Sequence, residues 1–276
     1  MDKLKLKTKA QKVDTLKYQL SRLYPSWFKK FRRLEWASTY KLNGLSHLTF
    51  LNGRSFDTIQ SSKFCPGKAL KLYQDSYETY DQEQFENDNH SKRQKLDSSH
   101  QEFELLADCF NDDPFLHGVT EMYPEILEND VIVISLRTTK NLLQRPDAME
   151  GQKMMKRLIQ AISSLKRGQH LILVNLVFLT RLQVGILYLL AYHFEEVGFI
   201  RPFKTDHGIF LSEFKGNNEK LLEYLTSIET NLTNELLSIL STEFITQEPL
   251  YSLLVAHNIN IIRESSLAML FTDDDT

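Results

Sequence analysis

Two continuous apolar runs, separated by a segment of helical period, constrain the fold of this chain more than any other feature. Residues 131–136 read VIVISL and residues 170–178 read HLILVNLVF. Apolar, β-branched runs without polar alternation are typical of strands that are covered on both faces. Residues 149–165, between them, repeat apolar side chains at spacings of three and four, as an amphipathic helix does. This order predicts an α/β fold with parallel strands joined by crossover helices.

The segments that follow extend the same pattern. A strongly apolar helix is expected from Leu182 to Val197, with one face that packs Leu187, Leu190 and Phe194 against the sheet. Two short strands are then expected at 199–203 and 208–214, with the second antiparallel at the end of a mixed, mostly parallel sheet. Leucines recur through residues 217–276, and we expect this part to be a helical extension.

Charge is distributed unevenly along the chain. Residues 1–44 hold twelve lysines and arginines against three acids, a net charge of +9, which leaves −12 for the rest of a chain whose total is −3. We therefore divide the sequence into a basic helical arm, a loop with a short helix, a disordered polar linker, an α/β domain and a C-terminal helical segment. Their bounds are 1–43, 44–80, 81–101, 102–216 and 217–276.

The basic arm combines cations with aromatic residues. A helix is predicted from Lys9 to Leu23, with Val13, Leu16 and Leu20 on one face. The cations and rings that surround Pro25 could bind RNA through phosphate contacts and base stacking. Alternatively, the rings pack on the body of the protein while the cations stay solvated. The candidate RNA-binding residues are Arg22, Lys29, Lys30, Arg32 and Arg33, interleaved with Trp27, Phe28 and Phe31.

The sequence favours a reducing compartment and offers no metal site. Its two cysteines, Cys65 and Cys109, are too few for a disulfide framework, which suits the nucleus or the cytoplasm. The histidines show no ligand spacing with either cysteine, so no metal is expected. Polar residues interrupt the most apolar window, 171–192, so no membrane span is expected. The charged start lacks the apolar stretch of a signal peptide.

The stretch from Gly168 to Gly216 resembles the end of an FtsJ-like RNA 2′-O-ribose methyltransferase domain. The features that carry the resemblance are LILVNLVF, VGILYLLAYHFEEVGFI and RPFK, preceded by the helix in NLLQRPDAMEGQKMMKRLIQAISSL. Within that family the chain is most similar to the cap-specific mRNA 2′-O-ribose methyltransferases of the adrift type, which modify the second transcribed nucleotide. These enzymes resemble two methyltransferase-like domains in tandem, the later one degenerate. The resemblance implies a Rossmann-like fold, here with a reduced front half, and S-adenosylmethionine as the family's cofactor.

The residues that the family uses for catalysis are not present where the resemblance predicts them. The family deprotonates the ribose 2′-hydroxyl with a lysine that carboxylates position and tune. The position of this lysine falls on Asn175, and an amide is no base near neutral pH. The acid expected after VIVISL is missing, and the acid of the last hairpin falls at best on Asp206, with Gly208 an equally good match. The ten glycines form no cluster of the kind that lets a backbone approach the cofactor.

We therefore expect no catalytic and no cofactor-binding residue in this chain. The leading hypothesis is a non-catalytic methyltransferase-like module of a cap 2′-O-ribose methyltransferase. The partners expected for it are capped mRNA and a catalytic domain in cis that lies outside these residues. The alternatives are an active methyltransferase with a divergent site and an unrelated α/β interaction protein.

Overall fold

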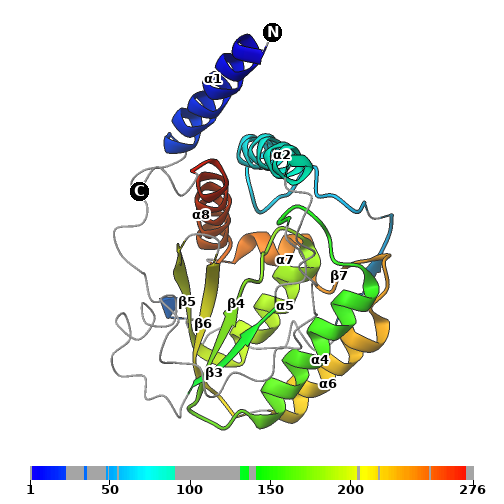
Figure 1. Ribbon diagram of the computed structural model, residues 1–276. Coiled ribbons are helices and arrows are strands. Elements are labelled where there is room, and N and C mark those ends of the chain that lie inside the picture. Colours follow the sequence, from blue (N-terminus) through cyan, green and yellow to red (C-terminus); the bar gives the residue numbers. More distant parts are fainter. Residues whose placement is uncertain are drawn as a thin grey trace.

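The computed structural model describes residues 2–22, 34–35, 48, 50–54, 56–90, 131–136, 141–203, 206–216, 218–248 and 250–271. Within these residues the chain is a mixed α/β protein whose principal sheet contains both parallel and antiparallel strands. Figure 1 shows helices along the sides of this sheet and a second group of helices gathered at its upper end. No helix of the described ranges is long and apolar enough to cross a membrane.

The principal sheet has five strands in the order β1-β5-β6-β4-β3. The two predicted runs form β3 and β4, which are parallel and start in register at Val131 and His170. Of these, β4 lies inside the sheet, but β3 is the last of its described strands, so the expectation that residues 131–136 form a central strand covered on both faces is wrong. The last two strands form an antiparallel hairpin, and β6 pairs with β4 as well as with β5. The strands are β1 (Leu34–Glu35), β3 (Val131–Ser135), β4 (His170–Val174), β5 (Phe194–Phe203) and β6 (Asp206–Phe214).

Two further expectations about this sheet are wrong. Only β3 and β4 are parallel neighbours, so among the described strands the sheet is mixed but not mostly parallel. The strand at 208–214 is antiparallel as predicted, yet it lies inside the sheet, between β4 and β5, and not at its end. Apolar runs reveal strands but not their order, because every interior strand has the same composition. Residues 101–130, on which the expected front half partly falls, lie outside the described residues.

The larger core cluster packs one face of the sheet against α4 (Ala148–Ser164), α5 (Arg181–Tyr192) and α6 (Asn218–Asn231). Each of the first two helices begins at a capping box, in which a side chain before the helix and one in its first turn satisfy each other's backbone N–H groups. Leu187 and Leu190 are fully buried in this cluster, which confirms the predicted buried face of α5.

Both apolar segments around α5 end earlier than predicted. The strand expected to reach Phe178 stops at Val174, because Asn175 adopts a positive φ of 61° that breaks the extended backbone. The helix expected to reach Val197 stops at Tyr192, and the chain continues as β5 from Phe194. Phe194 is fully buried and pairs with Phe214 in β6, so burial and strand pairing replace the last helical turn.

The C-terminal part is not wholly helical as expected. Between α6 and α7 (Thr242–Gln247) the chain forms the short strand β7 (Leu236–Ser238). This strand pairs antiparallel with β2 (Leu51–Asn52), far away in the sequence. The buried Leu236 thus belongs to a strand, although its spacing from other leucines matches a helix.

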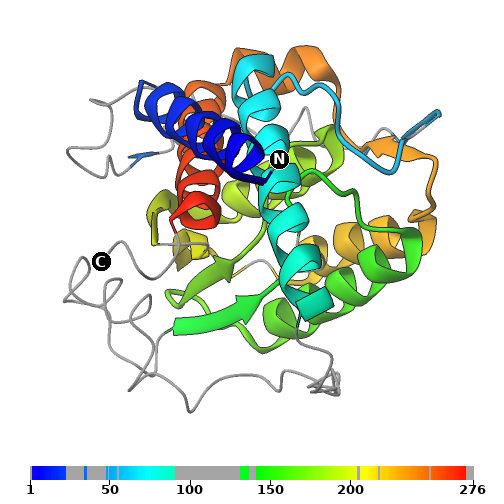
Figure 2. The ribbon, with the colours of Figure 1, turned by 45° about the horizontal axis from the view of Figure 1, so that its top comes forward.

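The second core cluster lies at the carboxyl ends of β3 and β4. It joins α1 (Asp2–Ser21), α2 (Gly67–His90) and α8 (Leu250–Leu270) with the loops that follow the two strands. Figure 1 shows α1, α2 and α8 together at this end, and Figure 2 shows α1 crossing above the other two. Leu16 and Leu20 of α1 are buried here, as their spacing predicted. The helix α2 extends to His90, so the first part of the expected linker is helical and the helix expected after Gly67 is long.

Candidate functional site

The carboxyl ends of β3 and β4 form the candidate site, because ligands of open α/β sheets bind outside the carboxyl ends of their strands. Here β4 ends at Val174, whose carbonyl accepts a hydrogen bond of 2.9 Å from the N–H of Leu136, just after β3. Asn175, on which the family resemblance predicts a lysine, therefore lies directly at this edge.

Asn175 has a structural role at the edge of the sheet. Its backbone N–H donates to the carbonyl of His207 at 2.7 Å, and its side-chain Oδ1 accepts from the N–H of His207 at 3.3 Å. With a φ of 61° the residue occupies the left-handed region, which asparagine tolerates better than most side chains do. The amide thus ties the end of β4 to the start of β6.

A neutral histidine from α8 closes over the same region. The side chain of His257 is only 1% exposed, and its ring centroid lies 4.7 Å from that of Phe199 in β5. Burial, together with the nearby His207, holds the pKa of His257 well below its usual value of 6.5. Neither ring nitrogen of His257 makes a hydrogen bond in the described structure. The ring therefore packs as an uncharged aromatic group.

Asn258, the next residue of α8, fixes the helix to the loops of the edge. Its Nδ2 donates to the carbonyl of Phe178 at 2.8 Å and to the carbonyl of Phe64 at 2.9 Å. The two loops also contact each other, because the hydroxyl of Ser62 donates to the carbonyl of Leu179 at 2.6 Å. Phe64 and Phe178 are buried. The space beyond the end of β4 is thus filled by the chain's own side chains.

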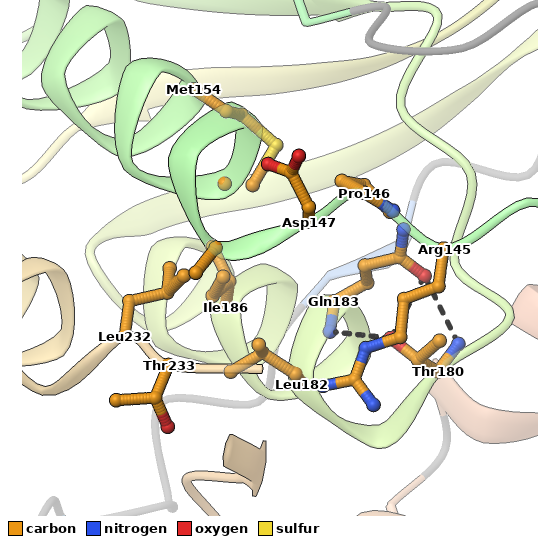
Figure 3. A pocket seen from close by; sticks show the side chains of 12 residues that line it. Arg145, Pro146, Asp147, Met154, Thr180, Leu182, Gln183, Ile186, Leu232 and Thr233 are labelled. Atoms are coloured by element: carbon orange, nitrogen blue, oxygen red, sulfur yellow. Dashed lines mark hydrogen bonds between the residues drawn. The ribbon is translucent and has the colours of Figure 1, made fainter. Parts of the chain in front are cut away.

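A small hollow lies beside this edge, between the first turns of α4 and α5 (Figure 3). Its cavity volume is about 40 Å³, which corresponds to only about three water molecules. Its polar groups serve the protein itself. Arg145 donates to the carbonyl of Leu236 at 2.6 Å, and the side chains of Asp147 and Thr180 accept from the first turns of their own helices. The hollow therefore has no evident role in ligand binding.

The structure describes only part of the predicted RNA-binding set. Arg22 is exposed, and its guanidinium carbon lies 4.6 Å above the ring of Tyr18. Lys29, Lys30, Arg32 and Arg33 lie outside the described residues. Asp206, the candidate acid of the last hairpin, is the backbone strand partner of Phe203 at the turn between β5 and β6.

Sequence reasoning missed His257 and Asn258, the side chains that cover the edge. The signal for them was two adjacent polar residues in the otherwise apolar stretch VAHNINII, since buried polar groups in such a helix need partners. Among the described residues no group of three or more histidine, cysteine, aspartate and glutamate side chains could hold a metal ion. Comparison with protein-family models and with curated proteins finds no match to this chain.

Proposed function

We propose that this chain is a non-catalytic methyltransferase-like module of an S-adenosylmethionine-dependent mRNA cap 2′-O-ribose methyltransferase. It supports a catalytic domain or helps to hold capped RNA, in the nucleus or the cytoplasm. The observation that carries the proposal is Asn175. By the sequence resemblance this amide stands where the family has its lysine, and its backbone and side chain are both hydrogen-bonded to the backbone of His207.

The sheet order is consistent with this origin. A methyltransferase domain of this lineage is expected to end in a reversed hairpin, and here β6 runs antiparallel between β4 and β5. Together with the sequence resemblance over residues 168–216, this supports descent from the family. It does not by itself indicate activity, because function resides in the site and not in the fold.

The described residues do not fit the family's cofactor. S-adenosylmethionine needs a close backbone approach at a glycine-rich turn and open space beyond the strand ends. At this edge, His257 and Asn258 of α8 pack over the end of the sheet, and Asn258 binds the backbone of both neighbouring loops.

A calorimetric titration with S-adenosylmethionine, followed by a methyl-transfer assay on capped RNA, tests the proposal. We expect no heat of binding and no transfer by the chain alone. The Asn175→Lys variant should not gain activity, because one restored base supplies neither the cofactor site nor the space for substrate. Transfer by the wild-type chain that disappears in Asn175→Ala would overturn the proposal.

The supporting role needs a separate measurement. The chain is added to the catalytic domain of a cap 2′-O-ribose methyltransferase, and the KM for capped RNA is compared with and without it. We expect a lower KM with the chain present and no change with an unrelated basic protein. An unchanged KM, with no complex between the two proteins in sedimentation, would contradict this role.

A further inference from the structure

Four side chains at the junction of α1 and α8 form a surface of cations and rings, in which Lys17 is half-buried and the other three side chains are exposed. Lys17, Tyr18 and Arg22 come from the last turns of α1 and the residue after it, and Phe271 directly follows α8. The ammonium nitrogen of Lys17 lies 4.0 Å from the centroid of the Phe271 ring, and Arg22 lies 4.6 Å from that of Tyr18. We call these four residues the cation–aromatic surface. Figure 1 shows the two helix ends that carry it next to each other.

Both rings stay exposed although a core lies directly beneath them. Tyr18 is 56% exposed and Phe271 is 48% exposed. Their neighbours Leu16, Leu20 and Leu270 are buried in the second core cluster, so both helix ends are anchored. The rings are held on a fixed support but not covered by it.

This arrangement provides the two interactions that an unpaired nucleic acid strand needs. Proteins that bind single strands place cations along the backbone and aromatic rings under successive bases. Each ring here carries a cation on one face and is roughly half exposed, which leaves surface on which a base can stack. The arm that contains three of the four residues has a net charge of +9, which attracts phosphates over longer distances.

We propose that the cation–aromatic surface binds single-stranded nucleic acid, with bases stacked on Tyr18 and Phe271 and phosphates neutralised by Lys17 and Arg22. That the strand is RNA rests on the proposed function. The arm continues directly from Arg22 into the candidate residues Lys29, Lys30, Arg32 and Arg33.

The sequence also places acidic residues close to this surface. Asp273, Asp274 and Asp275 follow Phe271 within four positions, a span of at most about 14 Å. Their negative charge opposes phosphate binding at this end of the molecule. Replacing all three by Asn should therefore tighten binding, a change that aromatic packing alone would not produce.

Fluorescence anisotropy with a labelled, uncapped twelve-nucleotide RNA tests the proposal on the full chain. The double variant Tyr18→Ala, Phe271→Ala should bind the single strand at least about tenfold more weakly, because each of the two stacked bases contributes about fivefold or more. Binding of a duplex of the same sequence should be unchanged by these substitutions, since its bases are already stacked. The control is Phe56→Ala, which removes a ring 60% exposed and paired with Arg54 elsewhere on the surface; it should change affinity by less than about twofold.

A salt titration separates the role of the cations from that of the rings. The double variant Lys17→Gln, Arg22→Gln should flatten the slope of log affinity against log salt by about 1.4, at 0.7 for each lost phosphate contact. The double variant Tyr18→Ala, Phe271→Ala should keep the wild-type slope of log affinity against log salt. Absence of binding by the wild-type chain, or binding by the aromatic variant within twofold of wild type, overturns the proposal. Neither measurement uses cofactor or methyl transfer, so its failure is distinct from failure of the proposed function.

Discussion

Among single residues, Asn258 connects three segments that are far apart in the sequence. Its amide donates to the carbonyls of Phe64 and Phe178, and the side chain is fully buried in α8. The Asn258→Ala variant leaves two buried carbonyls without this donor, at about 1–3 kcal/mol for each unsatisfied group. We expect the free energy of unfolding, measured in urea, to fall by about 2–5 kcal/mol.

The matched control for this substitution lies two residues further along the same helix. Asn260 is also buried, but its amide donates only to the carbonyl of Ala256 within α8. Asn260→Ala should cost about 1 kcal/mol or less, because that carbonyl is part of the helical ladder. Equal losses for the two variants would show that Asn258 does not connect the loops.

His257 makes the stability of the fold depend on pH. Its pKa is lower in the folded chain than the usual 6.5, so the unfolded chain binds the additional proton between these two values. The contribution of neutral His257 is therefore fully present above pH 6.5 and is lost as the pH falls below it, by up to about 1.4 kcal/mol per pH unit. Denaturant unfolding at pH 8, 6.5 and 5 measures this slope.

The His257→Phe variant isolates that effect. It keeps an aromatic ring against Phe199 and removes the proton-binding group, while the ring nitrogens that it loses make no hydrogen bond in the described structure. We expect its stability to depend less steeply on pH between 6.5 and 5 than that of the wild type. Identical slopes would mean that His257 binds its proton as readily in the folded chain as in the unfolded chain.

At the scale of elements, α5 and the segment after β7 approach each other through a glycine. A Cβ at Gly185 would lie 2.7 Å from Cγ1 of Ile239, which is fully buried and has little room to move. Alanine normally favours a helix interior by about 1 kcal/mol over glycine, but here overpacking should cost about 1–3 kcal/mol. We expect Gly185→Ala to lower the thermal midpoint of unfolding.

Two further variants check this reasoning. Gly67→Ala, at the start of α2, has nothing within 4 Å of the new Cβ and should leave stability unchanged or slightly raised. The double variant Gly185→Ala, Ile239→Val should recover part of the loss, because the two side chains share one contact. A stabilising effect of Gly185→Ala alone would show that α5 does not pack closely against Ile239.

Elements defined by local pattern could be predicted from the sequence. The runs at 131–136 and 170–174 have no polar alternation and form parallel strands, and α4 starts at the capping box of Asp147 and Glu150. The stretch from Phe194 to Val197 was predicted as helix but is a strand, because a short apolar run is compatible with both. This stretch is a strand because it pairs with β6, and that pairing joins segments that are distant in the sequence.

The closure of the candidate site could not be predicted either. The absence of a lysine at position 175 was visible in the sequence. The partners of Asn258 lie 80 and 194 positions away, and no local pattern indicates which loops a helix at 250–270 will cover. The sequence therefore predicts that the residues the resembled family uses for catalysis are replaced, and the structure shows α8 packed over the carboxyl ends of β3 and β4.

At the scale of the whole molecule, the described part contains two core clusters that depend on different segments. One lies between the sheet and α4, α5 and α6, and the other joins α1, α2 and α8. The double variant Leu16→Ala, Leu20→Ala removes buried side chains only from the second cluster. We expect faster hydrogen exchange in α1 and α8, and unchanged protection in α4 and β4.

The control for this experiment is Lys12→Ala, Gln19→Ala, which changes two exposed positions of the same helix. These substitutions should leave exchange unchanged in all four elements. If the leucine variant accelerated exchange equally everywhere, the two clusters would unfold as one cooperative unit.

The packing of α1 on α8 also has a consequence for biosynthesis. A ribosome makes α8 roughly 230 residues after α1, which at 5–20 residues per second is a delay of about 10–50 s. During that interval Leu16 and Leu20 have α2 within reach but not α8. The nascent chain therefore displays a basic helix whose apolar side is only partly covered until translation passes residue 270, and chaperones or RNA that bind such helices meet it first in this form.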